Sequence, residues 1–216
     1  MRRQFLIASL LFFGLSAGGR ATVGGSQTIE PLGFDLNSNE LVFLRYYQDE
    51  YDHDTEMLPQ LYRLSLAPNA TPAKVDLPFY GARRKAKEKA HERYEYQEND
   101  AGFYAFIRDL KAHLATLTPA TPVEHQVRIL THRPFIEHTS DGDVPAWEMV
   151  VAVTVDGLAG SGHVTNYCDR RVRLERWYSL PTPGLSVAII AHTGVPEEGC
   201  YEAEDIVVLR RTLPQP

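Results

Sequence analysis

Short runs of aliphatic and aromatic residues, separated by turn-forming residues, recur along most of this chain and favour a fold built mainly of β-strands. One run, Glu40–Tyr47, follows the turn residues Asn37, Ser38 and Asn39, whose side chains bond back to local backbone. Residues 59–66 alternate apolar and polar side chains, as a half-buried strand does. The same criteria predict strands at residues 29–36, 40–47, 59–66, 126–130, 147–155, 171–180, 185–191 and 206–209.

Three details refine this expectation. Pro31 has no backbone N–H, so the first strand is expected at a sheet edge. Residues 147–155 are almost continuously apolar, which predicts a strand covered on both faces. The glycine-rich residues 157–162 are expected to form a flexible loop.

A helical insertion is predicted at about residues 82–116. Residues 82–93 are dense in charge and lack an apolar stripe, which is typical of a solvated helix or a mobile segment. Asp100 is suited to cap a following helix, and prolines between residues 116 and 122 would end it. One face of that helix would be buried, through Phe103, Phe106, Ile107, Leu110 and Leu114.

The N-terminus has the layout of a secretory signal peptide. Arg2 and Arg3 precede an apolar run at residues 5–15, and Gly19 and Ala21 suit a cleavage site. We therefore expect a signal peptide at 1–21 and a single exported β-rich domain at 22–216, located in the periplasm or secreted. The two arginines also match the core of a twin-arginine signal, which stays open beside ordinary unfolded export.

Charge excludes some partners. Cleavage after residue 21 removes three arginines, which changes the net charge from −6 to −9. This balance argues against nucleic acid as a partner, because binding to phosphates needs clustered positive charge. No segment after the leader approaches eighteen apolar residues, so no membrane span is expected.

The mature chain has two cysteines, Cys168 and Cys200. In an oxidising compartment, an even pair is most simply a disulfide. The alternative makes Cys168 a nucleophile assisted by His163, although no thiol-enzyme motif surrounds either cysteine.

Residues 33–43, followed by residues 60–64, resemble one blade of a TolB-type β-propeller repeat. Residues 178–211 repeat the order of residues 34–66, namely strand, turn, apolar strand, acidic loop, strand. The whole chain also resembles a family of predicted secreted proteins. The resemblance implies an exported β-rich binding protein and supplies no catalytic residue. We expect a mainly β (α+β) fold whose antiparallel sheets are propeller-blade-like or sandwich-like.

An acidic loop is the best candidate for ligand binding. Its carboxylates could surround Ca²⁺, which takes six to eight oxygen ligands, and no other cofactor is predicted. A solvated hairpin loop is the alternative. The candidate residues are Asp49, Glu50, Asp52, His53, Asp54 and Glu56.

The sequence has no nucleophile elbow, phosphate-binding glycine loop or paired histidine motif. The first hypothesis is a non-enzymatic binding protein that contacts another protein of the cell envelope or extracellular space through loops at a sheet edge. The alternative is a metal-assisted hydrolase with scattered His and Asp ligands. A third hypothesis is a calcium-stabilised structural module.

Overall fold

The computed structural model describes residues 26–47, 58–67, 70–79, 93–139, 142–195 and 200–211. Most of these residues belong to strands, and a 20-residue helix, α2, lies among them. The elements are β1 (Gln27–Asp35), β2 (Glu40–Tyr47), β3 (Gln60–Ser65), β4 (Ala73–Lys74), α2 (Arg93–Ala112), β5 (Thr118–Pro119), β6 (His125–Thr139), β7 (Gly142–Val155), β8 (Leu158–Tyr167), β9 (Val172–Ser179), β10 (Leu185–Thr193) and β11 (Glu202–Arg211).

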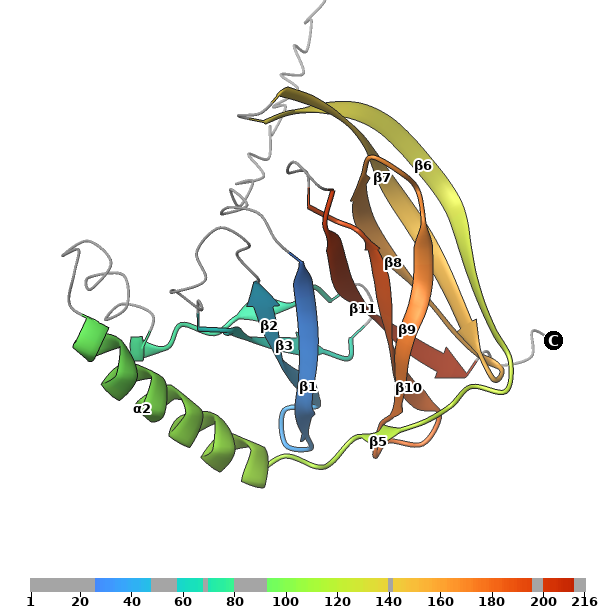
Figure 1. The fold of residues 1–216 in the computed structure, drawn as a ribbon. Helices are drawn as coiled ribbons and strands as arrows, with labels where there is room; N and C mark the ends of the chain where they lie inside the picture. Colours follow the sequence, from blue (N-terminus) through green and yellow to red (C-terminus); the bar gives the residue numbers. More distant parts are fainter. Residues whose placement is uncertain are drawn as a thin grey trace, which may run out of the picture.

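The strands form one mixed sheet that does not close on itself (Figure 1). Its main path runs β4-β3-β2-β1-β11-β10-β9-β5, and β8, β7 and β6 branch from the end of β11. Neighbouring strands are antiparallel except β1 and β11, which are parallel. The predicted mainly β fold with a helical insertion is confirmed, but the expectation of purely antiparallel sheets is wrong at this pair.

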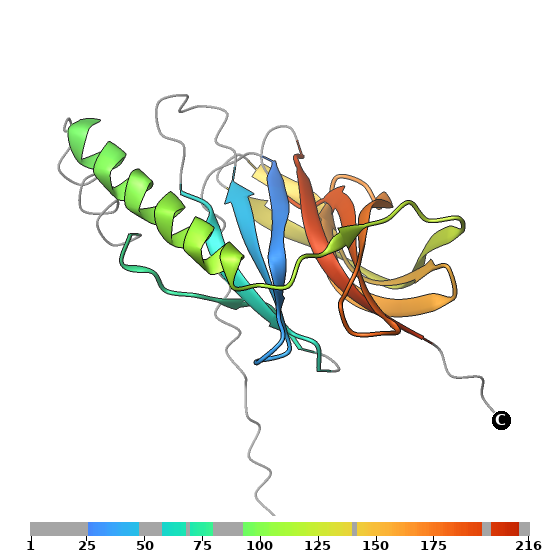
Figure 2. The ribbon, with the colours of Figure 1, turned by 90° about the horizontal axis from the view of Figure 1, so that it is seen from below.

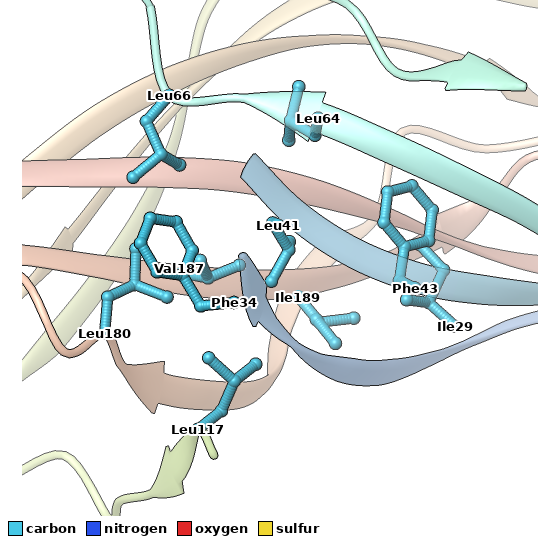
Figure 3. Close-up of a cluster of buried hydrophobic side chains, with 10 residues drawn as sticks. All are labelled: Ile29, Phe34, Leu41, Phe43, Leu64, Leu66, Leu117, Leu180, Val187 and Ile189. Atoms are coloured by element: carbon cyan, nitrogen blue, oxygen red, sulfur yellow. The ribbon is translucent and has the colours of Figure 1, made fainter. Parts of the chain in front are cut away.

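The two copies of the predicted repeat each form a three-strand meander. β1, β2 and β3 make the first, and β9, β10 and β11 make the second. Apolar side chains of the two meanders pack against each other (Figure 3), including Phe34 and Leu41 from the first and Val187 and Ile189 from the second. The two meanders therefore share one hydrophobic core.

β2 and β10 each contain an uninterrupted run of buried residues and contact a different core on each face. In β10, Val187 and Ile189 face the shared core, whereas Ala188 and Ile190 face a second core under β7 and β8. This alternation explains the uninterrupted apolar runs of β2 and β10, since each face of the strand meets a different layer.

β7 is buried mainly on one face, which contradicts the two-faced burial expected for residues 147–155. Met149, Val151 and Val153 are buried in the second core, whereas Ala152 is half-buried and Thr154 is exposed. The reason is that β6 and β8 flank β7 within one layer, so only the face toward β9–β11 is covered.

Helix α2 lies along β1–β3, on the side away from β6–β11 (Figure 2). Phe103 and Ile107 are buried against these strands, as the apolar face predicts, but Phe106 is 36% exposed. The expected cap at Asp100 is wrong, because the helix already begins at Arg93. Glu and Gln residues favour helix before the apolar face starts, so the helix extends beyond its amphipathic part.

Residues 157–162 do not form the predicted flexible loop. Asp156 and Gly157 have φ of 46° and 78° and make the tight hairpin turn between β7 and β8. From Leu158 the chain is paired with β7 at every residue of β8. The glycines misled the prediction because they serve a close approach between strands rather than a flexible segment.

β1 is not at an outer edge of the sheet, contrary to the expectation from Pro31. It lies between β2 and β11, but its pairing with β11 consists of Gln27 with Ala203. Pro31 is therefore placed where β1 has already separated from β11, so its missing N–H interrupts no ladder on that side. In the described part of the chain, no helix is long and apolar enough to cross a membrane.

Candidate functional site: a groove between β8 and β11

β8 and β11 are hydrogen-bonded at one end and then separate. Leu158 pairs with Arg211 and Ala159 with Arg210, and no backbone pair joins residues 160–167 to residues 202–209, all of which are described. β1 meets the same side of β11 only at Ala203. Between these two contacts, β11 has a backbone ladder on its β10 side alone.

The free side of β11 presents backbone donors and acceptors. Arg211 donates its N–H to Gly184 on the β10 side, so Arg210 and every second residue before it face the opposite side. The Val208 carbonyl accordingly points at β8, and a Cβ built on Gly160 would lie 2.2 Å from its oxygen. By the same alternation, Ile206 directs its N–H and C=O to this side.

β8 presents a second free edge. Its other edge is fully paired with β7, and Ala159 faces Arg210. Ser161 and His163 therefore direct their backbone groups toward β11, where the two strands have no ladder. Two strand edges that lack a backbone hydrogen-bond ladder thus face the same space.

A groove follows these edges. An inner cavity of about 560 Å³ is bounded by β8, by β11 and by the chain at the end of β3. A second cavity of about 540 Å³ adjoins it toward β1 and shares His163, Val164 and Asp205 with it. We call the two cavities together the β8–β11 groove. Small residues widen its inner part, among them Ala67, Ala70, Ala159, Gly160 and Gly162.

Asp205 is the centre of a charged network in the outer part of the groove. Its carboxylate accepts a hydrogen bond from Arg45 at 2.7 Å and lies 3.0 Å from Nε2 of His192. The side chains of Arg45 and His192 are 16% and 4% exposed, and that of Asp205 is 31% exposed. Burial alone would raise the pKa of Asp205, but the His192 hydrogen bond and the Arg45 charge outweigh it and lower the pKa. Asp205 is therefore a carboxylate that still faces the groove.

A second network secures the point where β1 and β11 separate. Glu204, on the opposite face of β11 from Asp205, accepts the backbone N–H of Ile29 at 2.6 Å and forms an ion pair with Arg176. Arg176 also donates to the carbonyl of Ile29 at 2.9 Å. These side chains replace the missing backbone ladder, since buried N–H and C=O groups need partners.

The predicted disulfide between Cys168 and Cys200 is confirmed, with 6.2 Å between the two Cα atoms. Cys168 therefore cannot be a thiol nucleophile helped by His163. Cys168 follows the end of β8 and Cys200 precedes β11, so the disulfide joins these strands at the end opposite the Ala159–Arg210 pair. The strands flanking the groove are thus linked at both ends.

The predicted ligand-binding residues Asp49, Glu50, Asp52, His53, Asp54 and Glu56 lie outside the described residues. Among the residues that are described, no three His, Cys, Asp or Glu side chains gather in a group that could hold a metal ion. Neither calcium binding nor metal-assisted hydrolysis gains support from the described geometry.

The sequence analysis missed the groove and its network. A signal was present: Arg45, His192 and Asp205 are polar residues at the ends of otherwise apolar strand runs. Buried polar side chains need partners, so such residues are expected to meet one another. Comparison with known proteins finds no matching family model, no matching curated sequence and no matching solved structure.

Proposed function

We propose that this chain is an exported, non-enzymatic binding protein that holds an extended segment of another envelope or extracellular protein in the β8–β11 groove. The observation that carries the proposal is that β8 and β11 each have an edge without a backbone hydrogen-bond ladder, and that both edges face one cavity. An extended segment placed there would supply the missing hydrogen-bond partners, which is the mode of recognition by β-strand addition.

The dimensions of the groove fit such a segment. From Ala203 to Val208, whose carbonyl lies against Gly160, the edge of β11 spans five residue steps, which is about 17 Å of extended chain. The small residues of β8 and of the segment after β3 leave room for side chains of the ligand. The signal-peptide pattern and the Cys168–Cys200 disulfide support a location outside the cytoplasm.

The test uses the exported chain and a display library of random ten-residue peptides with free C-termini. Selected peptides are synthesised, and hydrogen exchange of the protein is measured with and without them. We expect slower exchange at the amides of Ile206, Ser161 and His163, because those N–H groups gain partners. Libraries that yield no peptide, or peptides that protect only other strands, contradict the proposal.

A pair of variants localises the binding. Thr71 is an exposed residue that lines the inner cavity, so Thr71→Trp is expected to fill the groove and weaken peptide binding at least tenfold. Val123 is 90% exposed and lies outside the groove, so Val123→Trp is the matched control. Equal affinities of the two variants would show that the peptides bind elsewhere.

A further inference from the structure

One end of the β8–β11 groove is closed. The backbone pairs Ala159–Arg210 and Leu158–Arg211 join the two strands there. The Arg210 side chain also reaches across to donate to the carbonyl of Leu66, just past the end of β3. A bound chain that continued past this point would have to break these contacts, so a segment in the groove has to end or turn away here.

The closed end carries positive charge. Arg210 is the sole arginine or lysine among the described residues that line the inner cavity. Its guanidinium has five N–H donors in a planar fork that matches a carboxylate, and the bond to Leu66 engages one of its two terminal nitrogens. Donors therefore remain for an anionic group at this end.

At the outer end of the groove, toward β1, the charged side chains pair with one another. Asp205 and Glu148 line the outer cavity, and Arg45 is the one lysine or arginine described there. Arg45 is already bonded to Asp205, and Glu148 forms an ion pair with Arg133, so neither arginine is left for a carboxylate of the ligand. Arg210 and Asp205 are five residue steps apart along β11, which is about 17 Å, so the two ends act on different parts of a ligand.

From this polarity we infer that the groove takes the free C-terminus of its partner protein. This inference rests on the proposed function and specifies its ligand. The terminal carboxylate binds beside Arg210, and the preceding residues run along β11 toward the outer cavity. Apolar side chains occupy the space above the small residues of β8.

Charge complementarity fixes the direction of the bound chain. In the reverse direction, an N-terminal ammonium group would meet Arg210, and the C-terminal carboxylate would lie where both arginines are already paired. Like charges brought together in a partly buried site are unfavourable, so the opposite orientation is disfavoured.

The experiment compares peptides that differ by one group. Each groove-binding peptide from the library is prepared as the free acid and as the C-terminal amide, and both affinities are measured by fluorescence polarisation. We expect the amide to bind at least tenfold more weakly. Equal affinities, with protection of Ile206 in both cases, would overturn the inference and leave the proposed function intact.

Variants of the closed end assign the effect to one side chain. Arg210→Gln is expected to remove the preference for the acid, and Arg210→Lys to retain most of it. Arg211→Gln, at the neighbouring position, is the matched control and should keep the full preference. A full preference for the acid in folded Arg210→Gln protein would contradict the assignment. If that variant does not fold, the acid and amide affinities of the wild type still test the inference. The absence of any peptide that protects the groove would instead refute the proposed function itself.

Discussion

Replacing both cysteines with serine tests how much of the stability comes from the cross-link. The disulfide closes a loop with a sequence separation of 32 residues. In the chain-entropy description, a cross-link of this span restricts the unfolded chain by about 3.7 kcal/mol at 25 °C. For a domain of this size, that loss corresponds to a fall in Tm of about 10 °C.

The double serine variant isolates the cross-link well. Cys168 and Cys200 have φ of 62° and 51°, a region that is unfavourable for residues with a side chain. Serine also has a side chain, so the backbone strain at both positions is the same in the variant. The folded backbone therefore stays comparable, and the difference arises from the freedom of the unfolded chain. Reduced wild-type protein serves as a second comparison, because it retains both residues and lacks only the bond.

The measurement is urea unfolding of oxidised wild type, reduced wild type and the double variant, followed by fluorescence and circular dichroism. We expect both uncross-linked forms to lose about 3.7 kcal/mol of unfolding free energy and to have a larger m-value, because their unfolded chains are more expanded. A loss below about 1 kcal/mol with unchanged m-values would refute the entropic reasoning. A large loss in the variant but not in reduced wild type would assign the effect to the serines.

Three other perturbations test the packing around the groove. Glu204→Gln should lower the unfolding free energy by about 2 kcal/mol, because it removes the charge of a buried carboxylate whose partner Arg176 is partly exposed, whereas exposed Glu202→Gln should cost less than about 1 kcal/mol. Similar losses in urea titrations would contradict this. Gly160→Ala would place a methyl group 2.2 Å from a backbone oxygen and should cost about 2 kcal/mol, more than Gly162→Ala, which meets only a side-chain methyl at 3.1 Å. A smaller loss for Gly160→Ala, measured by thermal unfolding, would show that β8 can move away. The pKa of Asp205 is lowered below its usual value of 3.8 in the folded protein. The Asp205 carboxylate therefore stabilises the fold above pH 3.8, and this stabilisation is lost as the pH falls through the lower pKa of the folded state. Asp205→Asn should therefore flatten the fall in urea midpoint between about pH 5 and pH 2, and an unchanged slope would exclude this role.

Much of the sheet could be predicted because local patterns and tertiary burial agree. Residues 41–44 and 187–191 are continuously apolar, and the strands that contain them, β2 and β10, contact a core on each face. Alternation likewise located β3. For β6 the sequence analysis predicted only residues 126–130, and for β8 it predicted no strand. Both strands lack these patterns: β6 is exposed along most of its 15 residues, and β8 begins with small and polar residues.

The groove could not be predicted, for a different reason. The groove depends on which strands are not paired. The residue pattern of one strand does not show where its hydrogen bonding to a neighbouring strand ends. Arg45 and Asp205 are 160 positions apart in sequence, so their contact follows from the topology alone. Charged residues at the ends of apolar strand runs nevertheless indicate that a partner exists, and this signal can be read before a structure is known.

The same physical requirement links the network at Glu204 to the groove. Where β1 separates from β11, the backbone of Ile29 is bonded by Glu204 and Arg176, so the fold supplies side-chain partners for a main chain that has lost its neighbouring strand. At Ile206, two residues along the same edge, no such side chain is found among the described residues. A backbone edge that is satisfied at one position and left open at the next, beside a cavity, is the arrangement expected where a second chain supplies the missing partner.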